Sequence, residues 1–113
     1  MRDYSREIAE EMQKAGLPAQ CSYAKTPPQL PCVTLMLQEV KPRFLLDRGL
    51  FETEDLYEMT VWTETREEGC ALLRSAFHVL AECGLNKFGW NIGFHEAAQA
   101  HRIHCYASFQ ERF

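Results

Sequence analysis

The second half of the sequence changes its hydrophobic period from two to about 3.6 and back to two, and this change constrains the fold more than any other feature. Apolar and polar residues alternate from Leu56 to Thr63, as in a half-buried strand. A run with apolar residues at helical spacing then extends to Gly84, and alternation returns over 88–95 and 102–109. The pattern predicts a strand, an amphipathic helix and two closing strands, with the helix covering the apolar face of the sheet.

The predicted helix of this block has its own start and stop signals. Thr65, with Glu68 three residues later, has the spacing of a capping box, and Gly84 is suited to close the last turn. The apolar stripe consists of Cys70, Leu73, Phe77 and Leu80, widened by Leu72, Ala76 and Val79. A helix with so broad a stripe is expected to pack closely on the sheet.

The first half of the chain contributes another helix and at least one more strand. Helical spacing places four apolar residues on one face, namely Tyr4, Ile8, Met12 and Ala15. A first helix is therefore predicted over 3–15, ended by Gly16 and Pro18. A short strand around 20–24 is compatible with the sequence, and a proline-rich connector leads to a clear alternating strand over 32–40.

The segment 41–55, which we call the arm, is predicted to form the outer part of a long hairpin. Asp47-Arg48-Gly49 has the length and terminal glycine of a three-residue hairpin turn with a bulge. The register that follows pairs Leu46 with Leu50, Leu45 with Phe51, Lys41 with Asp55, Leu37 with Met59 and Leu35 with Val61. Pro42 is expected to interrupt the ladder, at a hinge or an edge position.

The arm tip, 44–51, is unusually apolar for a protruding segment. It carries five large apolar residues: Phe44, Leu45, Leu46, Leu50 and Phe51. Such side chains are costly to leave in water, and a domain this small has little room to fold them back. We therefore expect a partner to cover the tip, and these five residues are predicted oligomer or partner contacts.

These elements together predict a single α+β domain spanning 1–113. A mainly antiparallel sheet is packed by two helices, in the order α-β-β-β-α-β-β, with the arm as a long protruding hairpin. A chain of 113 residues is long enough for one core. The sequence contains no internal repeat and no low-complexity segment.

The charge, the apolar runs and the cysteine content argue against several classes of protein. Lys and Arg number 12 against 16 Asp and Glu, for a net charge of −4, and the basic residues are scattered, so nucleic-acid binding is not expected. The amino terminus lacks a signal-peptide pattern, and no apolar run approaches a membrane span. The five cysteines form no Cys-x-x-Cys pair, which is typical of reduced thiols buried as small apolar residues.

No residue pattern points to catalysis, a metal site or a cofactor. The histidines at His95, His101 and His104 invite a metal interpretation, but His101 and His104 face opposite sides of a strand. Cys70 and Ser108 are possible nucleophiles without a recognisable partner, and Cys70 also fits the buried helix stripe. No glycine-rich phosphate loop is present. We expect neither an enzyme nor a bound cofactor.

The polar face of the predicted sheet leaves two alternatives open. It consists of Glu58, Thr60, Trp62, Asn91, Arg102, His104 and Tyr106. The face is either solvated or in contact with a neighbouring subunit, because exposed Trp, Tyr and Arg side chains are favoured at the centre of interfaces. Trp62, Arg102 and Tyr106 are therefore further candidates for an oligomer interface.

The block Tyr57-Glu58-Met59-Thr60-Val61-Trp62-Thr63-Glu64-Thr65, running into Arg66-Glu67-Glu68-Gly69-Cys70-Ala71-Leu72-Leu73, resembles the tail terminator and tail completion proteins of long-tailed bacteriophages. In that family a strand ending in an aromatic or hydrophobic residue and a Thr leads through an acidic capping turn into a helix rich in Ala and Leu. The closing hairpin, which ends in Tyr106-Ala107-Ser108-Phe109, is similar to the family's last two strands. The opening helix and the approach to the strand at Pro31-Cys32-Val33 are similar as well.

The resemblance implies a structural protein that forms a ring, usually a hexamer, on the last ring of the tail tube, stops its polymerisation and offers a docking surface to the head or neck. Its partners would be copies of itself, the tail tube protein and head or neck connector proteins. Its location would be the virion tail, after assembly in the cytoplasm of the bacterial host. Two alternatives remain: a head-tail joining or tail-tube component, and a small regulatory or ligand-binding domain that dimerises through its sheet.

Overall fold

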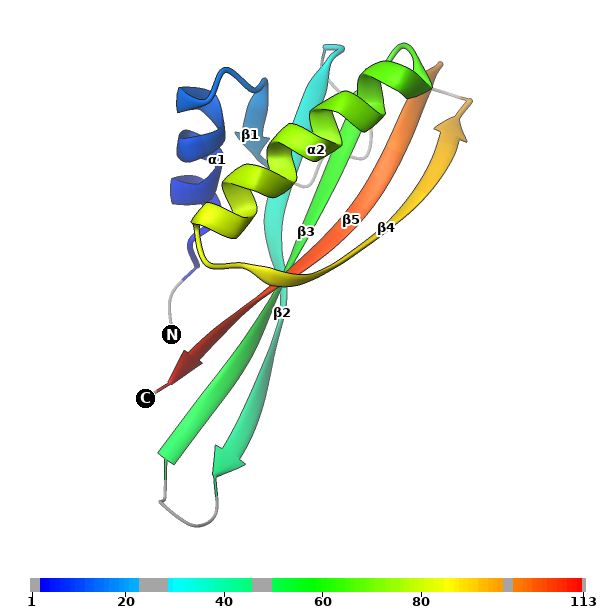
Figure 1. Ribbon diagram of the computed structural model, residues 1–113. Coiled ribbons are helices and arrows are strands. Elements are labelled where there is room, and N and C mark those ends of the chain that lie inside the picture. The colour runs from blue at the N-terminus through cyan, green and yellow to red at the C-terminus, as the bar shows by residue number, and fades with distance from the viewer. Residues whose placement is uncertain (1–2, 23–28, 46–49, 97–98, 113) are drawn as a thin grey trace.

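The computed structural model describes residues 3–22, 29–45, 50–96 and 99–112. The side chains at 43–45, 50, 51, 95 and 112 lie outside that description. The elements, in chain order, are α1 (Ser5–Lys14), β1 (Ala19–Cys21), β2 (Cys32–Leu45), β3 (Leu50–Thr63), α2 (Arg66–Glu82), β4 (Asn86–His95) and β5 (Ala100–Arg112). The predicted α+β class and the order α-β-β-β-α-β-β are confirmed (Figure 1).

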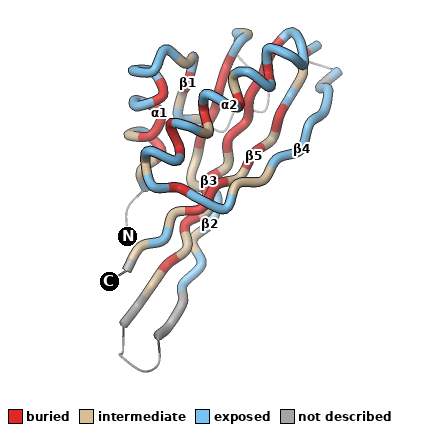
Figure 2. Tube along the Cα trace, in the orientation of Figure 1, coloured by how far each residue is buried: buried red, intermediate tan, exposed pale blue. Residues whose placement is uncertain are grey.

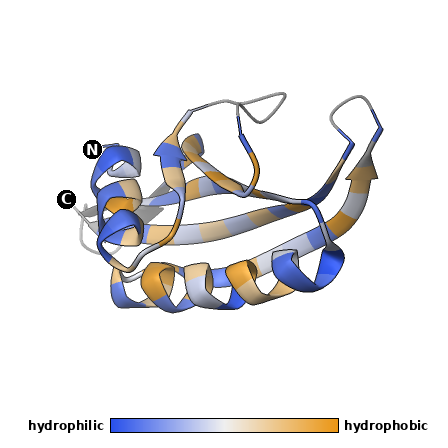
Figure 3. Cartoon of the chain, turned by 90° about the horizontal axis from the view of Figure 1, so that it is seen from above, coloured by the Kyte–Doolittle hydropathy of each residue, from blue (hydrophilic) through white to orange (hydrophobic). Residues whose placement is uncertain are grey.

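The strands form one five-stranded sheet in the order β1-β2-β3-β5-β4. The pairings β2–β3, β3–β5 and β4–β5 are antiparallel, whereas β1 pairs with β2 in parallel. Both helices lie on one face of the sheet (Figure 3).

The core lies between the helices and the sheet. Alternate residues of β2, β3 and β5 point into it, and the largest fully buried apolar side chains on this face are Met12, Leu35, Tyr57, Met59, Leu80 and Ile103. Figure 2 shows the buried positions concentrated under α1 and α2. Gly69 allows close approach at the start of α2, since an added Cβ would lie 2.9 Å from Thr63 Oγ1 and 3.2 Å from Ile103 Cδ1.

The predicted helix ends are confirmed in their main features. The Thr65 hydroxyl accepts a hydrogen bond from the Glu68 backbone N–H at 3.2 Å, which satisfies an N–H at the start of α2. Gly16 adopts φ +85°, and the Leu17 N–H donates to the Met12 carbonyl at 3.0 Å, which closes α1. Gly84, with φ +91°, follows α2 in the same way.

The predicted hairpin register is wrong by one residue in the arm and by two at its base. Leu45 pairs with Leu50 and Lys41 with Glu54, while beyond an irregularity between Leu37 and Glu39, Leu35 pairs with Met59. The register shifts by one residue in the arm because the connection between β2 and β3 is one residue longer than predicted. It shifts by a second residue at the bulge between Leu37 and Glu39. Neither the length of the connection nor the bulge could be predicted from the residue types. A shift of two returns each side chain to the same face, so the core assignment at the base is unaffected.

The arm projects beyond the helical layer (Figure 1). β5 accompanies β3 as far as the pair Glu52–Arg112, and the molecule measures 51 × 27 × 20 Å along its principal axes. Pro42 does not interrupt the ladder, because it occupies a register position opposite Thr53. Among the described residues β1 pairs with β2 only over 33–35, so Pro42 lies on an edge strand, the alternative that the sequence left open.

Candidate functional site

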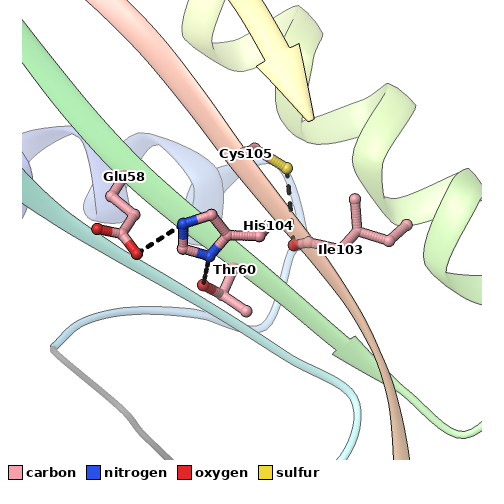
Figure 4. Close-up of polar contacts among 5 residues, drawn as sticks. All are labelled: Glu58, Thr60, Ile103, His104 and Cys105. Carbon is pink, nitrogen blue, oxygen red and sulfur yellow. Dashed lines mark hydrogen bonds and ion pairs between the residues drawn. The ribbon is translucent and has the colours of Figure 1, made fainter. Parts of the chain in front are cut away.

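Four surfaces of the described chain could carry function: the open sheet face, the edge strand β4, a groove beside α1, and the arm. On the open face, His104 lies opposite Thr60 in the β3–β5 register. Its Nε2 lies 2.8 Å from Glu58 Oε1, and its Nδ1 lies 3.4 Å from Thr60 Oγ1 (Figure 4). The ring also meets Tyr106 edge-on, with centroids 5.2 Å apart.

These contacts hold the His104 imidazole in place and occupy the nitrogens that it would need to bind a metal or transfer a proton. Both ring nitrogens of His104 already face side-chain oxygens, and the His104 and Glu58 side chains are each 29% exposed. A histidine that acts on a substrate or metal needs a free nitrogen. Within the described ranges, no group of three or more His, Cys, Asp and Glu residues is arranged to hold a metal ion. We interpret Glu58, Thr60 and His104 as a cross-strand contact that stabilises the pairing of β3 with β5.

Trp62 does not belong to an exposed set, which corrects one sequence-based expectation. Its side chain is 1% exposed and packs with Cys32 and Ala100, with Leu30 against them. The alternation of β3 correctly placed Trp62 on the face away from the helices, but it did not predict that Leu30 would pack there. Arg102, whose guanidinium carbon lies 5.9 Å from the centre of the Trp62 ring, is exposed, and Tyr106 is half-buried. Their role as interface residues stays a prediction.

The most exposed apolar surface among the described residues lies on β4. Trp90, Ile92 and Phe94 are 52%, 42% and 51% exposed. Phe77 of α2 stacks on Phe88 with centroids 4.8 Å apart and reaches Trp90 at 5.5 Å. The sequence predicted the apolar alternation of β4, but assigned it to the covered face. β4 is instead an edge strand, because β5 returns between β3 and β4, and α2 covers only its beginning.

A groove of about 350 Å³ lies between α1, the end of α2 and the sheet. Its lining consists of Tyr4, Glu7, Ile8, Glu11, Tyr57, Cys83, Leu85 and Phe109. Tyr4 crosses Phe109 edge-on at 5.7 Å, and the Tyr4 backbone N–H donates to the Tyr57 hydroxyl at 3.0 Å. Burial raises the pKa of Tyr57 to about 12. This groove could not be predicted from the sequence, since its lining comes from separate parts of the chain: α1 and the residue before it, β3, β5 and the segment after α2.

Beyond the groove, the core face of the sheet ends in polar side chains. Asp55 is 0% and Thr53 1% exposed, and within the described part of the chain neither oxygen of the Asp55 carboxylate has a hydrogen-bond partner. The pKa of Asp55 is raised, mainly because burial disfavours the charged carboxylate. The nearby Thr53 hydroxyl partly offsets this increase, although the two groups do not form a hydrogen bond of good geometry, and the negative charge of Glu111 adds to it. The sequence placed Asp55 opposite Lys41 as a charge pair; the structure places it opposite Val40 and Phe109.

The arm contacts predicted from the sequence stay predictions. The backbone places Phe44 opposite Phe51 and Leu45 opposite Leu50, at the ends of β2 and β3. Their side chains, and Leu46 altogether, lie outside the described residues. The strand bounds place Phe44, Leu45, Leu50 and Phe51 at the far end of the described part of the arm.

The described helices include none that is both long and apolar enough to cross a membrane. No protein-family model matches the chain, and no curated protein sequence matches it.

Proposed function

We propose that this protein is a morphogenesis protein of a long-tailed phage or prophage, of the tail terminator type. In this proposal it forms a ring, a hexamer as in the family it resembles, on the last ring of the tail tube, and offers a surface for the head or neck. The resemblance of the block 57–73 and the element order support this proposal. The single observation that carries it is the arm, which extends beyond the helical layer (Figure 1).

The arm supports an assembly role for a physical reason. A two-stranded ribbon is marginally stable in water without a third strand or a packed face. β5 accompanies β3 as far as Glu52, so the described part of the arm becomes two-stranded at the pairs Phe44–Phe51 and Leu45–Leu50. The sequence nevertheless places five large apolar residues at 44–51. A covering partner would stabilise the ribbon and remove these side chains from water.

The edge strand β4 supplies a second assembly surface. Its exposed Trp90, Ile92 and Phe94 lie on the outer strand of the sheet, and β5 separates this strand from β2 and β3, which form the arm. Two different surfaces on one subunit permit head-to-tail contacts, which close into a ring when the rotation between subunits is suitable. We therefore favour a ring over a symmetric dimer.

Light scattering combined with electron microscopy tests the proposal. The protein is examined alone at high concentration and mixed with tail tubes of the phage or prophage that encodes it. We expect it to form rings at least when the tail tubes are present. The variant Leu46→Ser/Phe51→Ser should keep the circular dichroism of the parent and lose most of this assembly. A monomer in both conditions, with no ring on the tubes, would contradict the proposal.

Two other outcomes identify the alternatives. Rings that join to heads, or that stack into tubes, without ending a tail tube would indicate a head-tail joining or tail-tube component. A dimer that tightens when a metabolite is added would indicate a regulatory or ligand-binding domain. Unfolding of the Leu46→Ser/Phe51→Ser variant would mean that the tip belongs to the core.

A further inference from the structure

The outer side of β4 is open to another strand. Among the described strands, β4 is the last in the sheet order and pairs with β5 alone, and Figure 1 shows it at the border of the sheet. In an antiparallel ladder, alternate residues point their backbone N–H and C=O groups to opposite sides. Alternate residues of β4 therefore turn these groups away from β5, which is a template for pairing with another strand.

This edge lacks the features that usually prevent such pairing. Native proteins protect an edge strand with charged side chains, especially Lys, or with Pro. No charged residue and no proline occurs between Phe88 and Phe94. The adjacent Lys87 places its Nζ 3.6 Å from Glu54 Oε2 of its own subunit. A strand from a second chain would therefore meet neither charge nor a missing N–H along this segment.

The opposite border of the sheet does not offer a matching edge. β1 has three residues and pairs with β2 only over 33–35. The part of β2 beyond β1 carries the exposed residues Glu39, Lys41 and Pro42. Pro42 has no N–H to donate to a neighbouring strand. Pairing of β4 with this border of another copy would thus set uncharged residues against charged ones.

The central segment of β4 is instead complementary to itself. Around Asn91, its sequence 88–94 has nearly the same residue types in both directions: phenylalanine at the ends, glycine next, and a large apolar residue on each side of the asparagine. Two antiparallel copies centred on Asn91 therefore place like residues opposite each other. The pairs are Phe88 with Phe94, Gly89 with Gly93, Trp90 with Ile92, and Asn91 with itself. Aromatic and apolar cross-strand pairs stabilise a sheet, and a two-fold contact requires a self-complementary surface.

This register also covers apolar side chains that one subunit leaves exposed. Phe77 of α2 stacks on Phe88 with centroids 4.8 Å apart, whereas Phe94 is 51% exposed. Opposite Phe88 of a second copy, Phe94 would extend this stack and leave water. On the other face, a Cβ added at Gly93 would meet no atom within 4 Å, so nothing in the subunit obstructs the pairing there.

We infer that β4 pairs in antiparallel with β4 of a second copy of this chain, about a two-fold axis at Asn91. The contact joins the two five-stranded sheets into one and closes after two copies. It covers the open edge of the free protein and does not depend on the proposed function. Because the proposed ring uses the same strand, the dimer has to open before a subunit joins the ring.

Opposite charges at position 91 test the two-fold axis. Asn91 is exposed, so Asn91→Lys and Asn91→Asp should each keep the circular dichroism of the parent. Each variant alone places like charges opposite each other and should weaken the dimer at least about tenfold in sedimentation equilibrium. An equimolar mixture of the two variants should recover dimers with one copy of each, because Lys then faces Asp.

Gln38→Lys is the matched control for this experiment. It adds the same charge at an exposed position of β2, away from β4, and should leave the dimer unchanged. A parent protein that remains monomeric at high concentration would overturn the inference. A mixture of the two Asn91 variants that dimerises no better than either variant alone would overturn it as well.

A thiol at position 91 tests the register. The exposed Cys21 and Cys70 are first replaced by serine, and the full-length protein is oxidised in air with a copper catalyst. Asn91→Cys should then give a disulfide-linked dimer on a non-reducing gel. Opposite residues of an antiparallel pair have Cα atoms about 4.5 or 5.5 Å apart, which is within the range of a disulfide.

Gly93→Cys in the same background is the control for the register. Position 93 faces Gly89 of the second copy, so the two introduced thiols lie four residues apart along the strand, or about 13 Å at 3.3 Å per residue. This variant should form little linked dimer. Equal linking at positions 91 and 93, or none at position 91 in a folded protein, would overturn the pairing at Asn91.

The results separate this inference from the proposed function. Rings on tail tubes from a protein that shows no dimer through position 91 would overturn the β4 contact and leave the proposed function standing. A dimer that responds to the Asn91 variants as expected, but forms no ring when tail tubes are present, would support the β4 contact and contradict the tail terminator proposal.

Discussion

Asp55 is an acidic residue in a buried position, where a charged side chain is unfavourable. It is fully buried, and within the described chain neither carboxylate oxygen has a hydrogen-bond partner. Its burial could not be predicted from the sequence, because it depends on the one-residue register of the arm and on how far β5 extends. Local signals such as the Thr65 cap and Gly16 were predictable, since they involve residues within one turn.

The raised pKa of Asp55 predicts a specific pH dependence of stability. The pKa in the folded state lies above the ordinary value of 3.8, so the folded protein binds the proton more tightly than the unfolded chain. This contribution to stability is fully present below pH 3.8 and is lost as the pH rises through the folded pKa. Asp55→Asn should therefore be more stable than the parent at pH 7, with a smaller difference at pH 4.

Urea unfolding at the two pH values measures this difference. Glu111→Gln is the matched control, because it removes the neighbouring charge while Asp55 remains, and should produce a smaller effect in the same direction. A less stable Asp55→Asn at pH 7 would mean that the ionised carboxylate has a stabilising partner.

At the scale of elements, strand types were predictable but strand neighbours were not. The alternation of 88–94 correctly predicted a strand with an apolar face. That β4 is the outer strand depends on β5 pairing with β3, which is a property of the whole sheet. The same reason explains the buried Trp62, whose neighbours Cys32, Ala100 and Leu30 come from other parts of the chain.

The edge position of β4 predicts separate effects on stability and assembly. Ile92→Thr/Phe94→Thr removes side chains that are 42% and 51% exposed, so the free energy of unfolding should fall by less than about 1 kcal/mol. Self-association, measured by light scattering, should weaken, because the substitutions remove exposed apolar side chains from an edge strand.

Phe88→Thr is the control for this pair. Phe88 is half-buried and stacked on Phe77, so the substitution should cost about 2 kcal/mol of folding stability. A large loss of stability in the Ile92→Thr/Phe94→Thr variant, with unchanged assembly, would place β4 in the core and contradict its role as a contact surface.

For the whole molecule, the domain class and the protruding arm could be predicted from the sequence. Both predictions depend on hydrophobic periodicity over long segments. The groove beside α1 was not predictable, because its lining residues come from α1, β3, β5 and the segment after α2. The function proposed from the resemblance requires surfaces rather than reactive groups. The arm, the β4 edge and the groove are three such surfaces on one small domain.

The length of tail tubes is the most direct measurement of the central claim. Purified tail tube protein polymerises with and without this protein, and electron microscopy records the tube lengths and ends. A terminator binds the last ring and prevents further addition, so we expect shorter tubes with an extra ring at one end. The Leu46→Ser/Phe51→Ser variant should leave the lengths unchanged. Unchanged lengths and bare ends with the parent protein would contradict the terminator role.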